Sequence, residues 1–350
     1  MHEGELVREK RVAYFSELRA VSCVAIVIFH TFYCAARLFQ PGGAPYLGTI
    51  LVRNCLLWAV PCFVMVTGAL LLNPEKRLGP DRVFKRYLPR AVGALVVFSF
   101  VFALFDFVVD AQPGGVPVLL GSWISAVLFN GSWLHMWYLY MLIAVYLMLP
   151  IYRVISRHCS DAELRYLLWL YAAFQALVPT VNFFLQNGLG PYIFVYTVYP
   201  LYLFLGYAIH SERVKISMGA SVALVIAGTI GLLAATYFGI EGEIDALRSL
   251  SGSFSSVLVL MQATGIFSLV HQLRAGAEKA PRVLLAIDKR SFGIYLLHVL
   301  VIYYIYRVLQ VNPYESGGLA LLAGLSVVVL VVTWAISWVL GHVPGIKKIV

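Results

Sequence analysis

Long stretches without a single charged side chain are the feature of this 350-residue sequence that most limits its fold. Several of them exceed about 20 residues, the length that a helix needs to cross a bilayer. They comprise residues 54–74, 111–152, 166–211, 216–240, 249–273 and 316–346. Hydrophobic residues make up 61% of the chain and charged residues 12%, unlike a soluble domain. The sequence therefore predicts an all-α polytopic membrane protein and excludes soluble enzymes, nucleic-acid binders, disulfide-rich secreted domains and outer-membrane barrels.

Turn-forming residues and charge clusters divide the chain into about ten transmembrane helices. We expect these near residues 18–38, 47–72, 88–109, 136–155, 164–184, 194–210, 215–238, 253–273, 291–309 and 317–340. The segment 110–134 either dips into the bilayer or lies at its interface. We treat residues 1–350 as a single transmembrane domain, with a cytoplasmic N-terminal segment at 1–17 and a cytoplasmic tail at 341–350.

The positions of the basic residues predict the orientation, because membrane proteins keep Lys and Arg on the cytoplasmic side. With the N-terminus inside, four of the 26 basic residues lie outside, namely Arg37, Arg53, Arg248 and Arg307. An even number of spans then places both termini in the cytoplasm. The net charge of +9 thus reflects topology, and we expect no nucleic-acid partner. The five cysteines show no paired spacing, so we expect neither disulfides nor a metal site.

Ionisable groups are rare in the predicted spans, and each is costly enough in lipid to be a candidate for function. Glu17 and Arg19 lie at the inner rim of the first span, and His30 follows Arg19 by eleven residues. Eleven residues return to nearly the same helix face about 16 Å deeper. A buried histidine on that face is a candidate general base. Alternatively, His30 bonds between helices and Arg19 is only a topology-setting charge.

Two further sets of polar residues have helical spacing. Arg86 and Arg90 lie four residues apart at the inner mouth of the third span. Paired guanidinium groups suit phosphate binding, although they can also anchor lipid headgroups. Two polar residues follow Ser291 at helical spacing: Tyr295 lies four residues later and His298 seven. The three side chains therefore share one face of the ninth span. Three polar side chains on one stripe are hard to explain as lipid-facing.

Two more segments stand out near the second and fourth spans. The second span ends in FVMVTG, residues 63–68, whose small residue allows close helix packing. The fourth begins HMWYLYMLIAVYLMLP, residues 135–150, with His135, Trp137 and Tyr138. Taken singly, these aromatic side chains are more typical of an interfacial belt than of a binding site.

In combination, these segments resemble the acyltransferase-3 family of integral-membrane O-acyltransferases, bacterial proteins that modify cell-surface glycans. Glu17, Arg19 and His30 form E-L-R, ten residues and His, similar to the family's first-span motif, where many members have Asp instead of Glu. FVMVTG resembles F-F-x-x-S-G, with Thr67 in place of Ser. FKRYLPR resembles the basic entry to the third span, and the 135–150 block resembles H-x-W-[FY]-L. SFGIYLLH, from Ser291, resembles S-[FY]-x-x-Y-L-x-H. The segments follow the family's order over nearly the whole chain, as in members that stand alone without an esterase-like domain.

The resemblance implies an O-acetyltransferase of the bacterial cytoplasmic membrane. Acetyl-CoA, or another short acyl-CoA, would be the donor, with its phosphates at Arg86 and Arg90, and no metal would take part. The acceptor would be a hydroxyl of a cell-surface or lipid-linked glycan. His30 would act as general base or form an acyl-histidine. Arg19, held by Glu17, would orient the donor or stabilise negative charge.

The remaining candidates would line the substrate pocket within the surrounding membrane lipids: His135, Trp137, Tyr138, Ser291, Tyr295 and His298. The alternative function is a polytopic transporter or exporter of a glycan precursor, without acyl-transfer activity. Such transporters usually show repeats and matching helix breaks in two halves, and the sequence shows neither. Nothing in the sequence indicates an oligomeric state.

Overall fold

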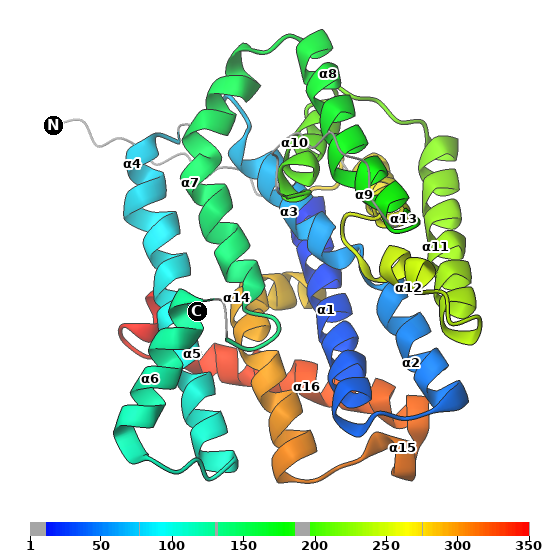
Figure 1. Cartoon of the computed structure of the whole chain (residues 1–350). Coiled ribbons are helices and arrows are strands. Elements are labelled where there is room, and N and C mark those ends of the chain that lie inside the picture. The colour runs from blue at the N-terminus through cyan, green and yellow to red at the C-terminus, as the bar shows by residue number, and fades with distance from the viewer. Residues whose placement is uncertain (1–11, 77, 130–131, 186–196, 275, 350) are drawn as a thin grey trace, which may run out of the picture.

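The computed structural model describes residues 12–76, 78–129, 132–185, 197–274 and 276–349, and these residues form helices joined by short loops (Figure 1). The α-helices are α1 Ala13–Phe39, α2 Gly43–Cys55, α3 Ala59–Leu71, α4 Pro80–Arg82, α5 Leu88–Val109, α6 Gly115–Leu128, α7 Trp137–His158, α8 Asp161–Ala172, α9 Val178–Asn182, α10 Tyr199–His210, α11 Met218–Glu241, α12 Asp245–Gly252, α13 Val257–Arg274, α14 Arg282–Tyr303, α15 Pro313–Ser316 and α16 Gly318–Leu340. Three π-helical turns are η1 Val83–Tyr87, η2 Ala173–Leu177 and η3 Tyr304–Val308, and one 3₁₀ turn is η4 Ile346–Lys348.

Nine helical segments of the described part are long and apolar enough to cross a membrane, which confirms the predicted class. An apolar run in lipid must form a helix, because only internal hydrogen bonds can then satisfy its backbone groups. The nine are Ala13–Phe39, Gly43–Leu71, Pro80–Val109, Trp137–His158, Asp161–Asn182, Met218–Glu241, Asp245–Arg274, Arg282–Val308 and Gly318–Leu340.

Two predicted segments differ in length from a full span. The expected sixth span, 194–210, corresponds to the 12-residue α10, and residues 186–196 lie outside the described part of the chain. The segment 110–134 contains the 14-residue α6, which is shorter than the roughly 20 residues of a spanning helix. Its outward apolar side chains include Val116, Ile124 and Leu128, so this helix offers an apolar surface to lipid without the length to cross it.

α1 is a central helix, and this position explains why it carries polar residues. About 67% of its apolar window is buried within the protein, against 22% for α11 and for α16. α1 packs against α14, α3 and α2, while α5 packs against α7. Polar groups on α1 and α14 therefore face protein rather than lipid, which is where such groups are tolerated in membranes.

Two π-helical turns come just before a proline within a spanning segment. η1 precedes Pro89, and η2 precedes Pro179. Proline cannot donate to the carbonyl four residues earlier, and its ring crowds that carbonyl, so a wider turn accommodates it without ending the helix. The first of these turns leads into α5, and Tyr87 at its end and Arg90 in α5 line a cavity.

Candidate functional site

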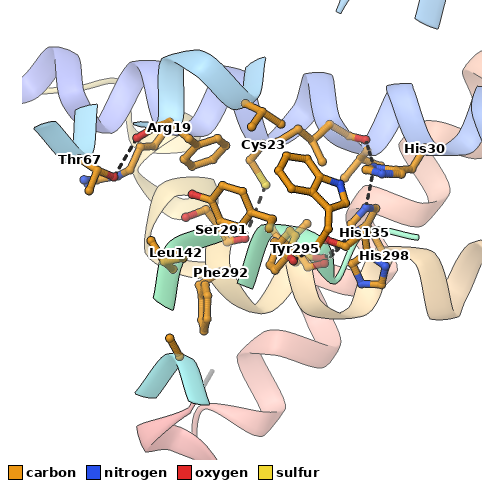
Figure 2. A pocket seen from close by; sticks show the side chains of 18 of the residues that line it. Arg19, Cys23, His30, Thr67, His135, Leu142, Ser291, Phe292, Tyr295 and His298 are labelled. Carbon is orange, nitrogen blue, oxygen red and sulfur yellow. Dashed lines mark hydrogen bonds between the residues drawn. The ribbon is translucent and has the colours of Figure 1, made fainter. Parts of the chain in front are cut away.

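A cavity of about 290 Å³ lies between α1, α3, α5, α7 and α14 (Figure 2). Most of its wall is apolar, with a few polar groups that converge on it, as is usual for small-molecule sites. Nine of the residues singled out in the sequence line it: Arg19, His30, Arg90, His135, Trp137, Tyr138, Ser291, Tyr295 and His298. Thr67 of FVMVTG also lines it, whereas Glu17 and Arg86 do not. Separate sequence segments thus meet at one place.

Three histidines form a cluster at one end of this cavity. The ring centroid of His298 lies 4.8 Å from that of His30 and 5.1 Å from that of His135. His30 and His135 are 6.2 Å apart. All three side chains are buried, with His298 fully so. Because they come from α1, α14 and the turn before α7, only the packing of these elements brings the imidazoles together.

Hydrogen bonds to backbone carbonyls assign the proton positions on two of these rings. Nδ1 of His298 lies 2.6 Å from the carbonyl oxygen of Tyr295, which can only accept, so this nitrogen carries the proton. The neutral ring then has an unprotonated Nε2, which lies 3.0 Å from Nδ1 of His30. Nδ1 of His30 also lies 3.0 Å from the carbonyl of Ile26. Both neighbours are acceptors, so Nδ1 of His30 is the donor and its Nε2 keeps a free lone pair.

His135 differs from the other two histidines in its hydrogen bonding. Its side chain is 1% exposed, and neither ring nitrogen bonds to a described residue. The backbone around it is held, because the hydroxyl of Tyr295 donates to the His135 carbonyl over 2.8 Å. Ring nitrogens that lack hydrogen bonds of normal geometry on a cavity wall are available to a ligand, because burying them unsatisfied costs free energy.

At the other end of the cavity, Arg19 and the neighbouring Glu17 form ion pairs with other helices and not with each other. Arg19 is bound in a bidentate manner by Asp288 of α14, over 2.7 and 3.0 Å. The expected contact of Arg19 with Glu17 is wrong, since Glu17 pairs with Arg274 of α13 over 2.9 and 2.6 Å. Residues two apart on a helix point in different directions, so each charge meets a different neighbouring helix. Figure 2 shows Arg19 and His30 well separated along α1.

Arg86 and Arg90 are both exposed residues, but they differ in their relation to the cavity. Tyr87, Arg90 and Ala91 form the cavity face of this segment, and Arg86 lies beside that face with an exposed side chain. The guanidinium of Arg90 lies over the ring of Phe292 at 4.7 Å, and its Nε donates to the carbonyl of Ile349 over 3.3 Å. Of the two arginines, Arg90 therefore lines the cavity and Arg86 does not.

The aromatic candidates form the middle of the wall. Tyr138 and Tyr295 lie with their ring centroids 5.2 Å apart. Trp137 packs on Phe254 at 5.5 Å. The hydroxyl of Ser291 donates to the carbonyl of Asp288 over 2.9 Å, within its own helix. These contacts show that the aromatic side chains of α7 face the interior rather than a lipid interface.

A second cavity, of about 190 Å³, lies against the first. Both are lined by four residues, His30, Ile26, Val60 and Trp137. The other lining residues of the second cavity come from the far half of α1, from α2 and the turn after it, from the end of α12, and from the loops before α7 and α13. His30 thus lies between the two cavities. The first extends towards Arg19 and Arg90, and the second extends towards Arg53.

Asp288 is the residue of the site that sequence reasoning missed. It is 6% exposed and holds Arg19, yet it precedes the predicted ninth span, 291–309. Asp288 lies three residues before Ser291, which is one helical turn along the same stripe. A longer predicted span would have included it, since the structure shows this helix to begin at Arg282.

The sequence profile of the acyltransferase domain matches residues 12–338 of this chain, nearly its whole length. No curated protein and no solved structure matches it significantly. The matched region contains all five similar segments and every residue that lines the two cavities. The chain therefore belongs to the acyltransferase-3 family and is a membrane acyltransferase.

Proposed function

We propose that this acyltransferase moves an acetyl, or another short acyl group, from acyl-CoA to a hydroxyl of a cell-surface or lipid-linked glycan in the bacterial cytoplasmic membrane. The observation that carries the proposal is the position of His30. His30 lines both cavities and has an unprotonated Nε2, and Arg19 and Arg90 line the first cavity. Two substrates entering from opposite sides would meet at this atom.

The first cavity suits the acyl donor. Arg19 and Arg90 lie at the ends of α1 and α5 that the distribution of basic residues predicts to be cytoplasmic, which is where acyl-CoA is made. Arg86 adds an exposed guanidinium beside this mouth. Guanidinium groups bind phosphate oxygens well. At about 290 Å³ the cavity is at the lower end of the range for ligand sites. It would take the narrow pantetheine arm and acyl group, with the nucleotide at the mouth.

His30 would activate the acceptor. Its Nε2 removes the proton from the glycan hydroxyl as the oxygen attacks the thioester carbon, forming the new ester. The carbon–sulfur bond then breaks, and the leaving thiolate takes the proton from the imidazolium, which restores the neutral ring. The same lone pair is also what an acyl-histidine intermediate would use. An acid-quenched reaction followed by mass spectrometry of the α1 peptide distinguishes these two routes.

The distance between Arg19 and His30 supports one of the two roles that the sequence left open for Arg19. Along α1, Arg19 lies about 16 Å from His30, too far to contact the thioester carbonyl at the imidazole. Its Nε and Nη2 are taken by Asp288, and Nη1 has no hydrogen bond to a described residue. We therefore assign Arg19 to donor orientation rather than to stabilisation of the transition state.

The test is acceptor-dependent release of free thiol from acetyl-CoA by the purified full-length protein. An acyltransferase releases one thiol for each acyl group transferred, whereas an exporter of a glycan precursor releases none. Comparing surface glycans from the native strain with and without the gene identifies the modified hydroxyl. Glycans that are identical in both strains, together with no thiol release, would favour the exporter.

A further inference from the structure

Among the described residues that line the second cavity, one side chain carries a permanent positive charge, Arg53 of α2. This cavity is otherwise lined mainly by aliphatic and aromatic side chains, together with His30. Arg53 lies in the candidate span Gly43–Leu71, and its Nε is buried. A cation at such a place is costly in a membrane protein, so it is a candidate for function by its position alone.

The side chain of Arg53 has no hydrogen bond or ion pair within the described residues, and its Nε is buried and unsatisfied there. Its guanidinium packs on two aromatic rings of α1, at 4.7 Å from the centroid of Tyr33 and 5.4 Å from that of Phe29. Such cation–π contacts offset only part of the cost of desolvating a cation. The position lacks an anion among the described residues.

Two other arginines on the predicted outer side show what a structural arginine looks like here. Arg248 pairs with Asp245 over 3.1 Å and donates to the carbonyl of Gly239 over 2.8 Å. Arg307 is bound by two carboxylates, Asp106 and Asp110. Arg53, by contrast, faces a cavity that the reacting histidine also lines.

The surroundings of Arg53 suit a sugar acid or a sugar phosphate. Phe29 contacts the guanidinium and packs on His30 with ring centroids 4.9 Å apart. Arg53 and His30 line the same cavity, so a ligand on Arg53 would share this cavity with His30. Trp137, Tyr33 and Phe254 supply aromatic faces around the cavity. A few polar groups among apolar ones fix the orientation of a small ligand.

We propose that the second cavity is the acceptor site and that Arg53 binds an anionic group of the acceptor, a carboxylate or a phosphate. This inference rests on the proposed function. A carboxylate would belong to the sugar ring, as in a uronic acid, and a phosphate to the link between sugar and lipid. Both present oxygens in the geometry that a guanidinium binds with two hydrogen bonds. The chain then selects acidic acceptors over neutral ones of the same size.

The experiment measures binding by calorimetry, so that it does not depend on turnover. The full-length protein in detergent is titrated with methyl β-glucuronide, glucose 1-phosphate and methyl β-glucoside. We expect at least one anionic probe to bind about tenfold more tightly than the neutral glucoside. Whichever anion is preferred identifies the source of the charge.

Variants at Arg53 assign the preference to this side chain. Arg53→Gln should abolish the difference between anionic and neutral probes, and Arg53→Lys should restore part of it. Arg37→Gln removes the same charge from an exposed position of α1 that lines neither cavity, and it should keep the full preference.

Three results would overturn the proposal: wild-type protein that binds all three probes equally, wild-type protein that binds neither anion, or an Arg53→Gln variant that weakens all probes by the same factor. The proposed function fails separately. Anion binding without any thiol release from acetyl-CoA would retain the Arg53 site and reject acyl transfer. Thiol release without any preference for anions would reject the Arg53 site and retain acyl transfer.

Discussion

Nε2 of His298 lies 3.0 Å from Nδ1 of His30, and the two rings belong to helices 268 residues apart in the chain. Because Nδ1 of His298 donates its proton to the carbonyl of Tyr295, Nε2 of His298 can only accept from His30. His298 therefore sets the tautomer of His30 and leaves Nε2 of that ring as the basic atom. This relationship gives the two histidines different roles and therefore different mutational effects.

Replacing His30 with alanine should reduce acceptor-dependent thiol release by about 100-fold or more, the usual contribution of general acid–base catalysis. The protein should still insert and elute normally from size-exclusion chromatography, because His30 contributes little to the apolar core. Turnover within a few-fold of the wild type would rule out His30 as the base or nucleophile.

Replacing His298 should be milder, and its effect should depend on the substitute. His298→Gln retains an oxygen that can accept from Nδ1 of His30, whereas His298→Ala retains none. We expect kcat to fall more for alanine than for glutamine, with the KM for acetyl-CoA nearly unchanged. If His298→Ala proved more damaging than His30→Ala, the two roles would have to be exchanged.

Removing Arg90 should weaken donor binding more than it slows the chemical step. Arg90 lines the cavity and Arg86 lies exposed beside it, so Arg90→Ala should raise the KM for acetyl-CoA more than Arg86→Ala, and the double variant should raise it most. Added 3′-phospho-ADP should compete with the donor less well in the double variant. Lys85→Ala is the matched control, since Lys85 is exposed and pairs with Asp81.

In that experiment, an unchanged KM in the double variant would return both arginines to the role of lipid-headgroup anchors. An equal effect of Arg86→Ala and Arg90→Ala would show instead that the donor is recognised outside the cavity, at the surface where both guanidinium groups are accessible.

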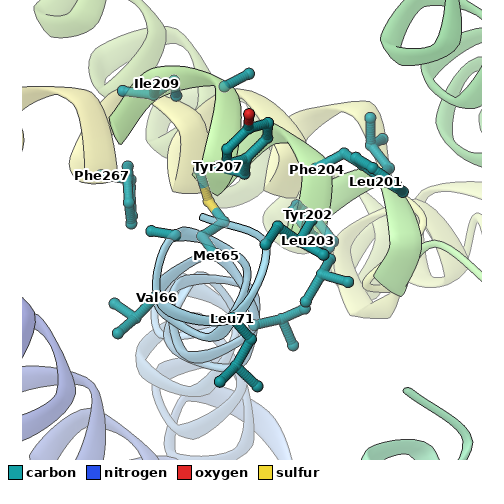
Figure 3. Packing of buried hydrophobic residues seen from close by; sticks show 14 of the residues in the cluster. Met65, Val66, Leu71, Leu201, Tyr202, Leu203, Phe204, Tyr207, Ile209 and Phe267 are labelled. Atoms are coloured by element: carbon teal, nitrogen blue, oxygen red, sulfur yellow. The ribbon is translucent and has the colours of Figure 1, made fainter. Parts of the chain in front are cut away.

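α3 and α10 pack against each other through side chains such as Met65 and Leu203 (Figure 3). Two glycines allow the close approach, as the small residue of FVMVTG predicts. A Cβ on Gly68 would lie 1.8 Å from the carbonyl oxygen of Leu203, and one on Gly206 would lie 2.1 Å from that of Met65. Neither backbone can move without separating the helices. Gly68→Ala and Gly206→Ala should therefore each destabilise the protein by at least about 1–3 kcal/mol.

Thermal unfolding in detergent, followed by size-exclusion chromatography, measures this effect. Gly121→Ala in α6 is the control, because no described atom lies within 4 Å of the place that a Cβ would take there, and its midpoint should match the wild type. Stable Gly68→Ala and Gly206→Ala variants would show that the two helices do not pack as closely as described.

Cysteine labelling tests the orientation on which the donor side depends. An impermeant reagent outside intact cells should label Ala44→Cys and Glu243→Cys but not Gly79→Cys or Lys279→Cys, all of which are exposed positions. The background is low in a variant whose five native cysteines are replaced. Labelling of Gly79→Cys from outside would place Arg90 on the wrong side for cytoplasmic acyl-CoA. Protection of Glu243→Cys would mean that one span has been miscounted.

The sequence alone determined the class, the approximate spans and the residues that share a helix face. Long uncharged runs must become membrane helices, and helical periodicity converts the spacing of Ser291, Tyr295 and His298 into one stripe, all three of which line the cavity. The order of the motifs was enough to predict the family, which the match over residues 12–338 confirms.

The tertiary structure alone decided which helices are neighbours, and hence every contact between them. Arg19 meets Asp288 rather than Glu17, and His30 meets His298, because α1 packs against α14. In lipid, apolar side chains that face the protein and those that face the acyl chains have the same hydropathy, so sequence patterns do not reveal which surfaces associate. Spacing along a helix follows from backbone geometry, but the pairing of charges, the histidine cluster and the exposure of Arg53 to a cavity follow only from how the helices pack.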